Sequence, residues 1–171
     1  MPGSGYVSAS FDPTQITGMV GDIFPTAGLG EIVRVKNKTY QYVRFDNGVG
    51  NVAAVAGRGA YWKDIANFVV TSDFSDSQGG GTELCLTAGV FLYAMTDLYY
   101  GWIQTGGYNA SVYVSAAGAV GQRLLPSTTD GQFTTVATGS VTAAQAGAQR
   151  VGTQLTAAVS NLCAAYLEIL I

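Results

Sequence analysis

Residues 31–45, EIVRVKNKTYQYVRF, carry the clearest signal for the fold class. β-Branched and aromatic residues dominate Ile32–Val35 and Tyr40–Phe45, and the polar Lys36-Asn37-Lys38 between them is typical of a turn. Asp46-Asn47-Gly48 follows as a second turn, because Asn and Gly tolerate a positive φ. The segment therefore predicts two neighbouring strands joined by a short connection.

From residue 84 onward the chain continues this pattern of short strands between turn residues. The spacing of about 8–12 residues between turns is typical of a sandwich or barrel. We therefore predict a mostly β protein, a small β-sandwich or β-barrel-like domain. The Ala-rich stretch 141–149 is predicted as a helix or a loop, and 163–171 as a buried strand or the start of a helix. Further strands are expected at 61–71, 84–87, 90–95, 99–105, 111–115, 121–125 and 132–136.

Residues 1–29 differ in composition from the remainder. They are rich in Gly, Pro, Ser and Thr, and Pro2, Pro13 and Pro25 interrupt any helix. Apolar residues still recur there, so we predict an extended N-terminal arm that docks on a neighbour. Residues 30–171 would form the β-rich domain, with a candidate internal divide at the SDSQGGG loop, 75–81.

Composition restricts the classes of function. The chain has 171 residues, a length that suits one domain with an arm, and only 11% of them are charged, against about 25% in typical globular proteins. The net charge of −3 offers no overall attraction for nucleic acid, and no apolar run reaches the ~18–20 residues of a membrane helix. We expect neither partner.

Charge is scarce in the second half of the chain. From 98 to 171 only Arg123, Asp130, Arg150 and Glu168 are charged. Partner subunits covering much of this surface would explain the scarcity, and a surface rich in Ser, Thr and Gln is the alternative.

Catalytic and metal chemistry lack their usual residues. The chain has no histidine, which removes Ser–His and Cys–His nucleophiles and His-ligated metals. Cys85 and Cys163 are too few for a zinc site, and without a secretory signal we expect two reduced, buried thiols in a protein made in a cytoplasm. Asp73 and Asp76 flank Phe74-Ser75 near the 75–81 loop, where two carboxylates are candidate calcium ligands, but the EF-hand spacing is absent. We predict no enzyme, no cofactor and no metal.

Six of the eight basic residues lie between Arg34 and Lys63. Arg34, Lys36 and Lys38 are two residues apart, which predicts one shared strand face. Such a face is solvated or contacts an acidic partner, and interleaved aromatic residues leave nucleic acid as a weaker alternative. The aromatic run Tyr99-Tyr100-Gly101-Trp102 indicates strand core with a partly exposed edge, or else a sugar-binding platform.

One longer pattern carries a resemblance. The segment Tyr100–Gly107, YGWIQTGG, precedes a Val-rich strand, then Gly121–Ser127, GQRLLPS, and Val151–Leu155, VGTQL, before the apolar end Ala165–Leu170. This order of glycines and strand residues resembles the capsid decoration proteins, also called cement or head-stabilising proteins, of tailed bacteriophages. The resemblance covers 84–171, and more weakly 31–62.

The resemblance implies a virion structural protein, made in the host cytoplasm. It would bind the outer surface of a phage capsid as a homotrimer and stabilise the head by bridging major capsid protein subunits. A glycan-binding surface module using Tyr99, Tyr100 and Trp102 is the alternative, and a hydrolase using Asp73, Asp76 or Asp97 is a third hypothesis. The residues expected to contact the capsid are Tyr6, Phe11, Ile16, Ile23, Phe24, Arg34, Lys36 and Lys38.

Overall fold

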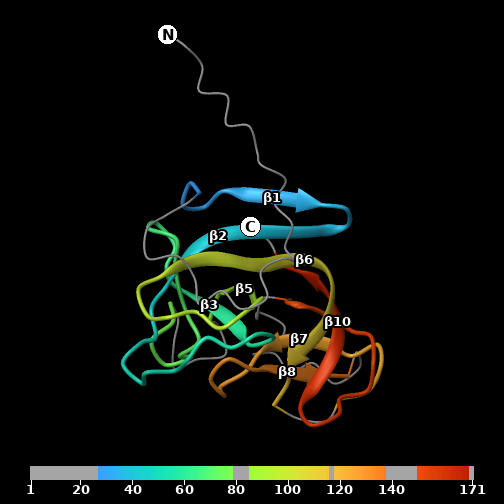
Figure 1. The fold of residues 1–171 in the computed structure, drawn as a ribbon. Coiled ribbons are helices and arrows are strands. Elements are labelled where there is room, and N and C mark those ends of the chain that lie inside the picture. Colours follow the sequence, from blue (N-terminus) through green and yellow to red (C-terminus); the bar gives the residue numbers. More distant parts are fainter. Residues whose placement is uncertain (1–26, 79–84, 116–117, 138–149, 170–171) are drawn as a thin grey trace.

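A computed structural model describes residues 27–78, 85–115, 118–137 and 150–169 (Figure 1). All regular elements in these residues are strands, which confirms the mostly β prediction. No helix in this part of the chain is long and apolar enough to cross a membrane. The strands are β1 (Ile32–Val35), β2 (Lys38–Phe45), β3 (Gly59–Asp64), β4 (Val69–Thr71), β5 (Thr87–Phe91), β6 (Tyr100–Tyr113), β7 (Arg123–Pro126), β8 (Phe133–Val136), β9 (Gly152–Gln154) and β10 (Leu162–Glu168).

The first half of the fold is a closed barrel. Its strands follow the order β2-β4-β3-β5-β6, and β2 pairs again with β6 to close the ring. All pairings are antiparallel except the short parallel contact of β2 with β4. β1 extends this barrel as a hairpin on β2, joined by the two-residue turn Lys36-Asn37, in which Lys36 has a φ of 55°.

The second half is a curled sheet of strands in the order β6-β10-β9-β7-β8. A parallel bridge from Phe133 in β8 returns to Val114, just after β6, so the sheet nearly closes on itself. β6 therefore belongs to both halves, and β6 and β10 run side by side in Figure 1.

β6 changes partners at its glycines. Gly106 pairs with Thr39 of β2 on one side and with Glu168 of β10 on the other. The Nε2 group of Gln104 donates to the carbonyls of Gly106 (3.0 Å), Gly107 (3.3 Å) and Tyr108 (3.0 Å). Gln104 thus bonds to carbonyls at the point where the strand passes from the barrel to the curled sheet.

Two large buried clusters form the core. One fills the barrel and includes Val43, Phe45 and Ile103. The other lies under the curled sheet and includes Leu124, Phe133 and Leu167, together with Tyr61 from β3. The Tyr61 hydroxyl donates to the Gln132 carbonyl, and burial raises the pKa of Tyr61 well above its ordinary value. Tyr61 thus connects the barrel, to which its strand belongs, with the core under the curled sheet.

Both cysteines lie in the core under the curled sheet. They are free thiols and buried, as predicted. Burial raises the pKa of Cys85 to about 12 and that of Cys163 to about 11. Neither thiol therefore carries a charge near neutral pH.

Several strand predictions need correction. Residues 61–71 are two strands rather than one, because the chain turns between β3 and β4, where Phe68 takes a φ of 52°. Residues 99–105 and 111–115 join through Gly106-Gly107 into the single strand β6. The end of the chain forms the strand β10 rather than a helix. The predicted arm and the Ala-rich stretch 141–149 lie outside the described residues, except for the arm's last three residues.

Candidate functional site

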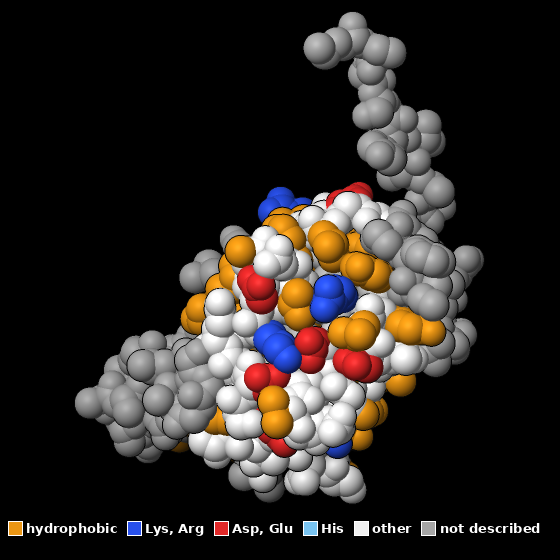
Figure 2. Space-filling model, turned by 90° about the vertical axis from the view of Figure 1, so that its left-hand side faces the viewer, with side chains coloured by type: hydrophobic (Ala, Val, Ile, Leu, Met, Phe, Trp, Pro, Cys, Tyr) orange, Lys and Arg blue, Asp and Glu red, His pale blue; other side chains and the backbone are white. Residues whose placement is uncertain are grey.

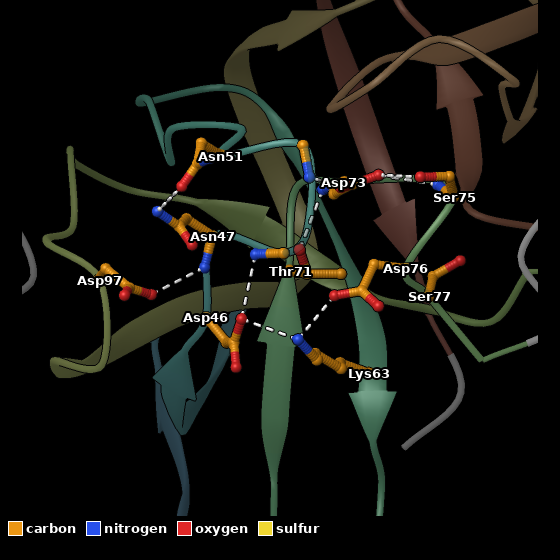
Figure 3. Close-up of polar contacts among 12 residues, drawn as sticks. Asp46, Asn47, Asn51, Lys63, Thr71, Asp73, Ser75, Asp76, Ser77 and Asp97 are labelled. Carbon is orange, nitrogen blue, oxygen red and sulfur yellow. Dashed lines mark hydrogen bonds and ion pairs between the residues drawn. The ribbon is translucent and has the colours of Figure 1, made fainter.

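A cluster of polar side chains joins the loops that follow β2 and β4 to Lys63 of β3 (Figure 3). Lys63 in β3 points between two carboxylates, with its Nζ 2.8 Å from Oδ1 of Asp46 and 2.6 Å from Oδ2 of Asp76. Burial acts against the charge of Lys63, but its hydrogen bonds to both carboxylates prevail and raise its pKa. Burial likewise opposes the charge of Asp46, and hydrogen bonds from Lys63 and Gly48 lower its pKa overall.

Asp73 follows β4 and organises two loops. It is 2% exposed, and its Oδ2 accepts from the Gly50 amide at 2.7 Å. Its Oδ1 accepts from the amide and the hydroxyl of Ser75, at 2.9 and 2.6 Å. Burial favours the neutral acid, but these donors outweigh it and lower the pKa of Asp73. Asp73 therefore connects the loop at 48–51 to the turn at 73–75 through hydrogen bonds to Gly50 and Ser75.

The carboxylates proposed for hydrolysis or calcium binding thus have separate structural contacts. Asp73 binds loop amides, Asp76 pairs with Lys63, and Oδ1 of Asp97 accepts from the Asn47 amide at 2.9 Å. The pKa of Asp73 is lowered, which is opposite to the shift that a general acid needs. Among the described residues, no group of three or more His, Cys, Asp or Glu side chains could hold a metal ion.

The basic residues predicted to share a strand face do not do so. Arg34 pairs with Thr39 and Lys38 with Val35, so neighbouring pairs in the hairpin place Arg34 and Lys38 on opposite faces. Lys36 lies in the turn. The two-residue spacing was misleading because the chain reverses direction between Val35 and Lys38. Contact of these residues with a capsid stays a prediction.

The aromatic run does not form the predicted sugar platform as a unit. Trp102 is 9% exposed, and its ring packs 5.1 Å from that of Tyr42, between ring centroids. Tyr99 and Tyr100 are half-buried. The indole lies in a third buried cluster on β2 and β6 with Tyr40 and Tyr42, because alternation along β6 turns Trp102 toward these rings.

Sequence reasoning missed a groove beside the β3–β4 turn. Its volume is about 450 Å³. The Nε of Arg44 is buried there without a hydrogen-bond partner among the described residues. The residues that line this groove come from three separate segments, at 29, 44 and 64–69, so no local sequence pattern predicts it. It is lined by Leu29, Arg44, Asp64, Ala66, Asn67, Phe68 and Val69.

The surface drawn in Figure 2 has no large patch of only basic or only acidic side chains. Basic and acidic side chains lie next to each other and alternate with hydrophobic ones. This arrangement favours contacts with proteins over contacts with a polyanion. The arm residues predicted to touch a capsid, Tyr6, Phe11, Ile16, Ile23 and Phe24, lie outside the described residues.

Comparison with known proteins finds no match to a family model and none to a curated protein. Among solved structures, the chain is similar to the head fiber gp8.5 N base of bacteriophage phi29. The identity is 12% and the TM-score 0.49, over 77% of this chain and 94% of that chain. A likeness at this level says nothing about function.

Proposed function

We propose that this chain is a virion structural protein that binds the outer surface of a phage capsid. In this proposal it assembles as a homotrimer, bridges major capsid protein subunits and has no catalytic role. The observation that carries the proposal is the surface of the second half. Between 98 and 171 four residues are charged, while Tyr108, Val120, Leu155, Val159 and Tyr166 are all at least 40% exposed. Such a surface is typical of one covered by partners.

The resemblance to decoration proteins supports the same role. Its motif residues Gln104, Gly106 and Gly107 lie at the joint of β6, where both halves of the fold meet. These motif residues stabilise the backbone and include no reactive side chain, as expected for a protein that binds a partner and does not catalyse a reaction.

Stabilisation would come from buried interface area repeated by symmetry. A standard interface buries about 1,200–2,000 Å². When one trimer contacts several capsid subunits, each further contact forms at a high effective concentration, so modest contacts sum to a strong one. This gain needs no conformational change in the domain.

The proposal is tested with phage heads that were assembled without this chain. Purified full-length protein is mixed with these heads, sedimented and quantified, and the heads are then heated. We expect saturable binding and a higher temperature of DNA release than for bare heads. Protein that stays in the supernatant at every concentration would overturn the proposal.

Two further measurements address its parts. Light scattering should give a mass near three times 17.7 kDa, and a monomer at all concentrations would remove the trimer. Deleting residues 1–25 should abolish binding to heads without changing the circular dichroism spectrum. Unchanged binding by the truncated protein would contradict a role for the arm.

A further inference from the structure

The curled sheet carries a continuous row of side chains across four of its strands. Tyr108 in β6 pairs with Tyr166 in β10, Tyr166 with Thr153 in β9, and Thr153 with Arg123 in β7. Directly paired residues project from the same face of a sheet, so these four form one cross-strand row. Each tyrosine is 42% exposed, whereas Ala165 and Leu167, on either side of Tyr166 in β10, are buried in the core.

Basic groups flank these tyrosines. Packing of the β1–β2 turn against Gly107 brings the Nζ of Lys38 over the Tyr108 ring, 5.9 Å from its centroid. At the other side, Arg150 donates to the Thr153 hydroxyl at 2.8 Å and pairs with Glu168 at 2.9 Å. We call this set the tyrosine strip: Lys38, Tyr108, Tyr166, Thr153, Arg123, Arg150 and Glu168.

The strip concentrates the charge of the second half of the chain. Three of the four charged residues between 98 and 171 lie in it, all but Asp130. With Lys38 the strip has three cations and one carboxylate, on a chain whose net charge is −3. Its positive character is therefore local, and it opposes the sign of the whole molecule.

The chemistry of the strip matches a protein interface. Tyrosine and arginine are, with tryptophan, the residues enriched at binding hot spots, and a tyrosine ring supplies contact area at a small entropy cost. Leu155, 40% exposed, follows Gln154 at the end of β9 and adds apolar area. Polynucleotide is disfavoured, because Glu168 stands within the strip and the net charge of the chain repels phosphates.

We propose that the tyrosine strip docks on an acidic patch of a partner protein. The inference rests on the proposed function, in which that partner is the capsid surface. The two rings cover apolar atoms of the partner, while Arg123, Arg150 and Lys38 pair with carboxylates around them. This face, not the tip of the β1–β2 hairpin alone, then determines how the domain sits on the head.

The test uses the full-length chain and heads assembled without it. The double variant Tyr108→Ala/Tyr166→Ala should bind these heads at least about tenfold more weakly, the loss expected of hot-spot rings. Arg150→Gln should weaken binding less and reduce its salt dependence, whereas Glu168→Gln should strengthen binding, because it removes a charge that repels an acidic partner. Val49→Ala, 85% exposed in the loop after β2, is the matched control and should bind as the wild type does.

The outcomes separate this inference from the proposed function. No binding by the wild type overturns the proposed function together with this partner. Wild-type binding that the double variant retains, with both proteins folded by circular dichroism, overturns the strip alone. Loss of the wild-type oligomer in the double variant would make the strip a contact between copies, and strip-dependent binding of an oligothymidine probe would assign it to nucleic acid. Either result overturns the acidic protein partner.

Discussion

The Oε1 atom of Gln104 accepts a hydrogen bond of 3.1 Å from Nδ2 of Asn109, five residues further along β6. Both side chains are buried. The side-chain amide of Gln104 also donates to the carbonyls of Gly106, Gly107 and Tyr108, which lie between these two residues. A single side chain thus hydrogen-bonds to three carbonyls and one side-chain amide where β6 leaves the barrel and enters the curled sheet.

Replacing Gln104 should therefore weaken the whole fold. Gln104→Ala removes the hydrogen bonds to the buried Gly107 carbonyl, to the partly buried carbonyls of Gly106 and Tyr108, and from the buried Asn109 amide. A buried group left without a partner costs about 1–3 kcal/mol, so we expect a loss of roughly 3 kcal/mol in the free energy of unfolding. Urea unfolding followed by circular dichroism measures it. Gln122→Ala is the control, since Oε1 of Gln122 accepts an exposed hydrogen bond from the Ala119 amide. Equal stability of the two variants would contradict the role of Gln104.

Alanine substitutions at Gly107 and Gly121 distinguish the cost of a positive φ from the cost of a steric clash. Gly107 and Gly121 both have a φ of 84°, but a Cβ on Gly107 would collide with the Asn37 carbonyl, while no atom of the described residues lies within 4 Å of one on Gly121. Gly121→Ala should cost about 1–2 kcal/mol through its left-handed conformation alone. Gly107→Ala should cost clearly more and shift the Asn37 turn. Thermal unfolding of both variants checks this, and similar melting temperatures would argue against a tight contact at Gly107.

The lowered pKa of Asp73 predicts acid sensitivity. Its carboxylate is stabilised in the folded state, so its contribution is present above the ordinary pKa of 3.8 and is lost as the pH falls through the lower, folded value. Asp73→Asn should lose about 1–3 kcal/mol near neutral pH, because an amide oxygen cannot replace both acceptors. The variant should also show a flatter decline in stability below pH 4. Urea titrations across this range measure both effects, and parallel curves would contradict this role of Asp73.

The two thiols should be inert in the native protein. Burial and pKa values of about 12 and 11 keep Cys85 and Cys163 protonated near pH 8, and only thiolates react readily with disulfide reagents. Ellman's reagent should find almost no thiol in the folded chain and two in concentrated guanidinium chloride. Rapid reaction of one thiol before unfolding would show that its side of the core opens.

Local patterns predicted the mostly β content but not every strand, since the single strand β5 (Thr87–Phe91) stands where strands were predicted at 84–87 and 90–95. The Ile32–Val35 strand matches the prediction, and Tyr40–Phe45 lies inside β2, because β-branched residues and a polar turn specify a hairpin within a few residues. The two free, buried cysteines were also predicted, because free cysteine is among the most buried residue types. The division of 61–71 into β3 and β4 was missed, although Asp64 and Asn67 mark the turn: Asn67 donates to both carboxylate oxygens of Asp64, and Phe68 takes a positive φ.

Sequence by itself determined that this chain is a β protein with a hairpin at Ile32, scarce charge after residue 98 and no histidine. Only the tertiary structure decided which side chains share a surface. Arg34 and Lys38 are close in sequence and lie on opposite faces, whereas Lys38 and Tyr108 are seventy positions apart and in contact. The reason is that the alternation of side chains along a strand fixes their faces only within that strand. Which side chains are neighbours across the sheet depends on how the strands pair, and β6 pairs with β2 before Gly106-Gly107 and with β10 after them.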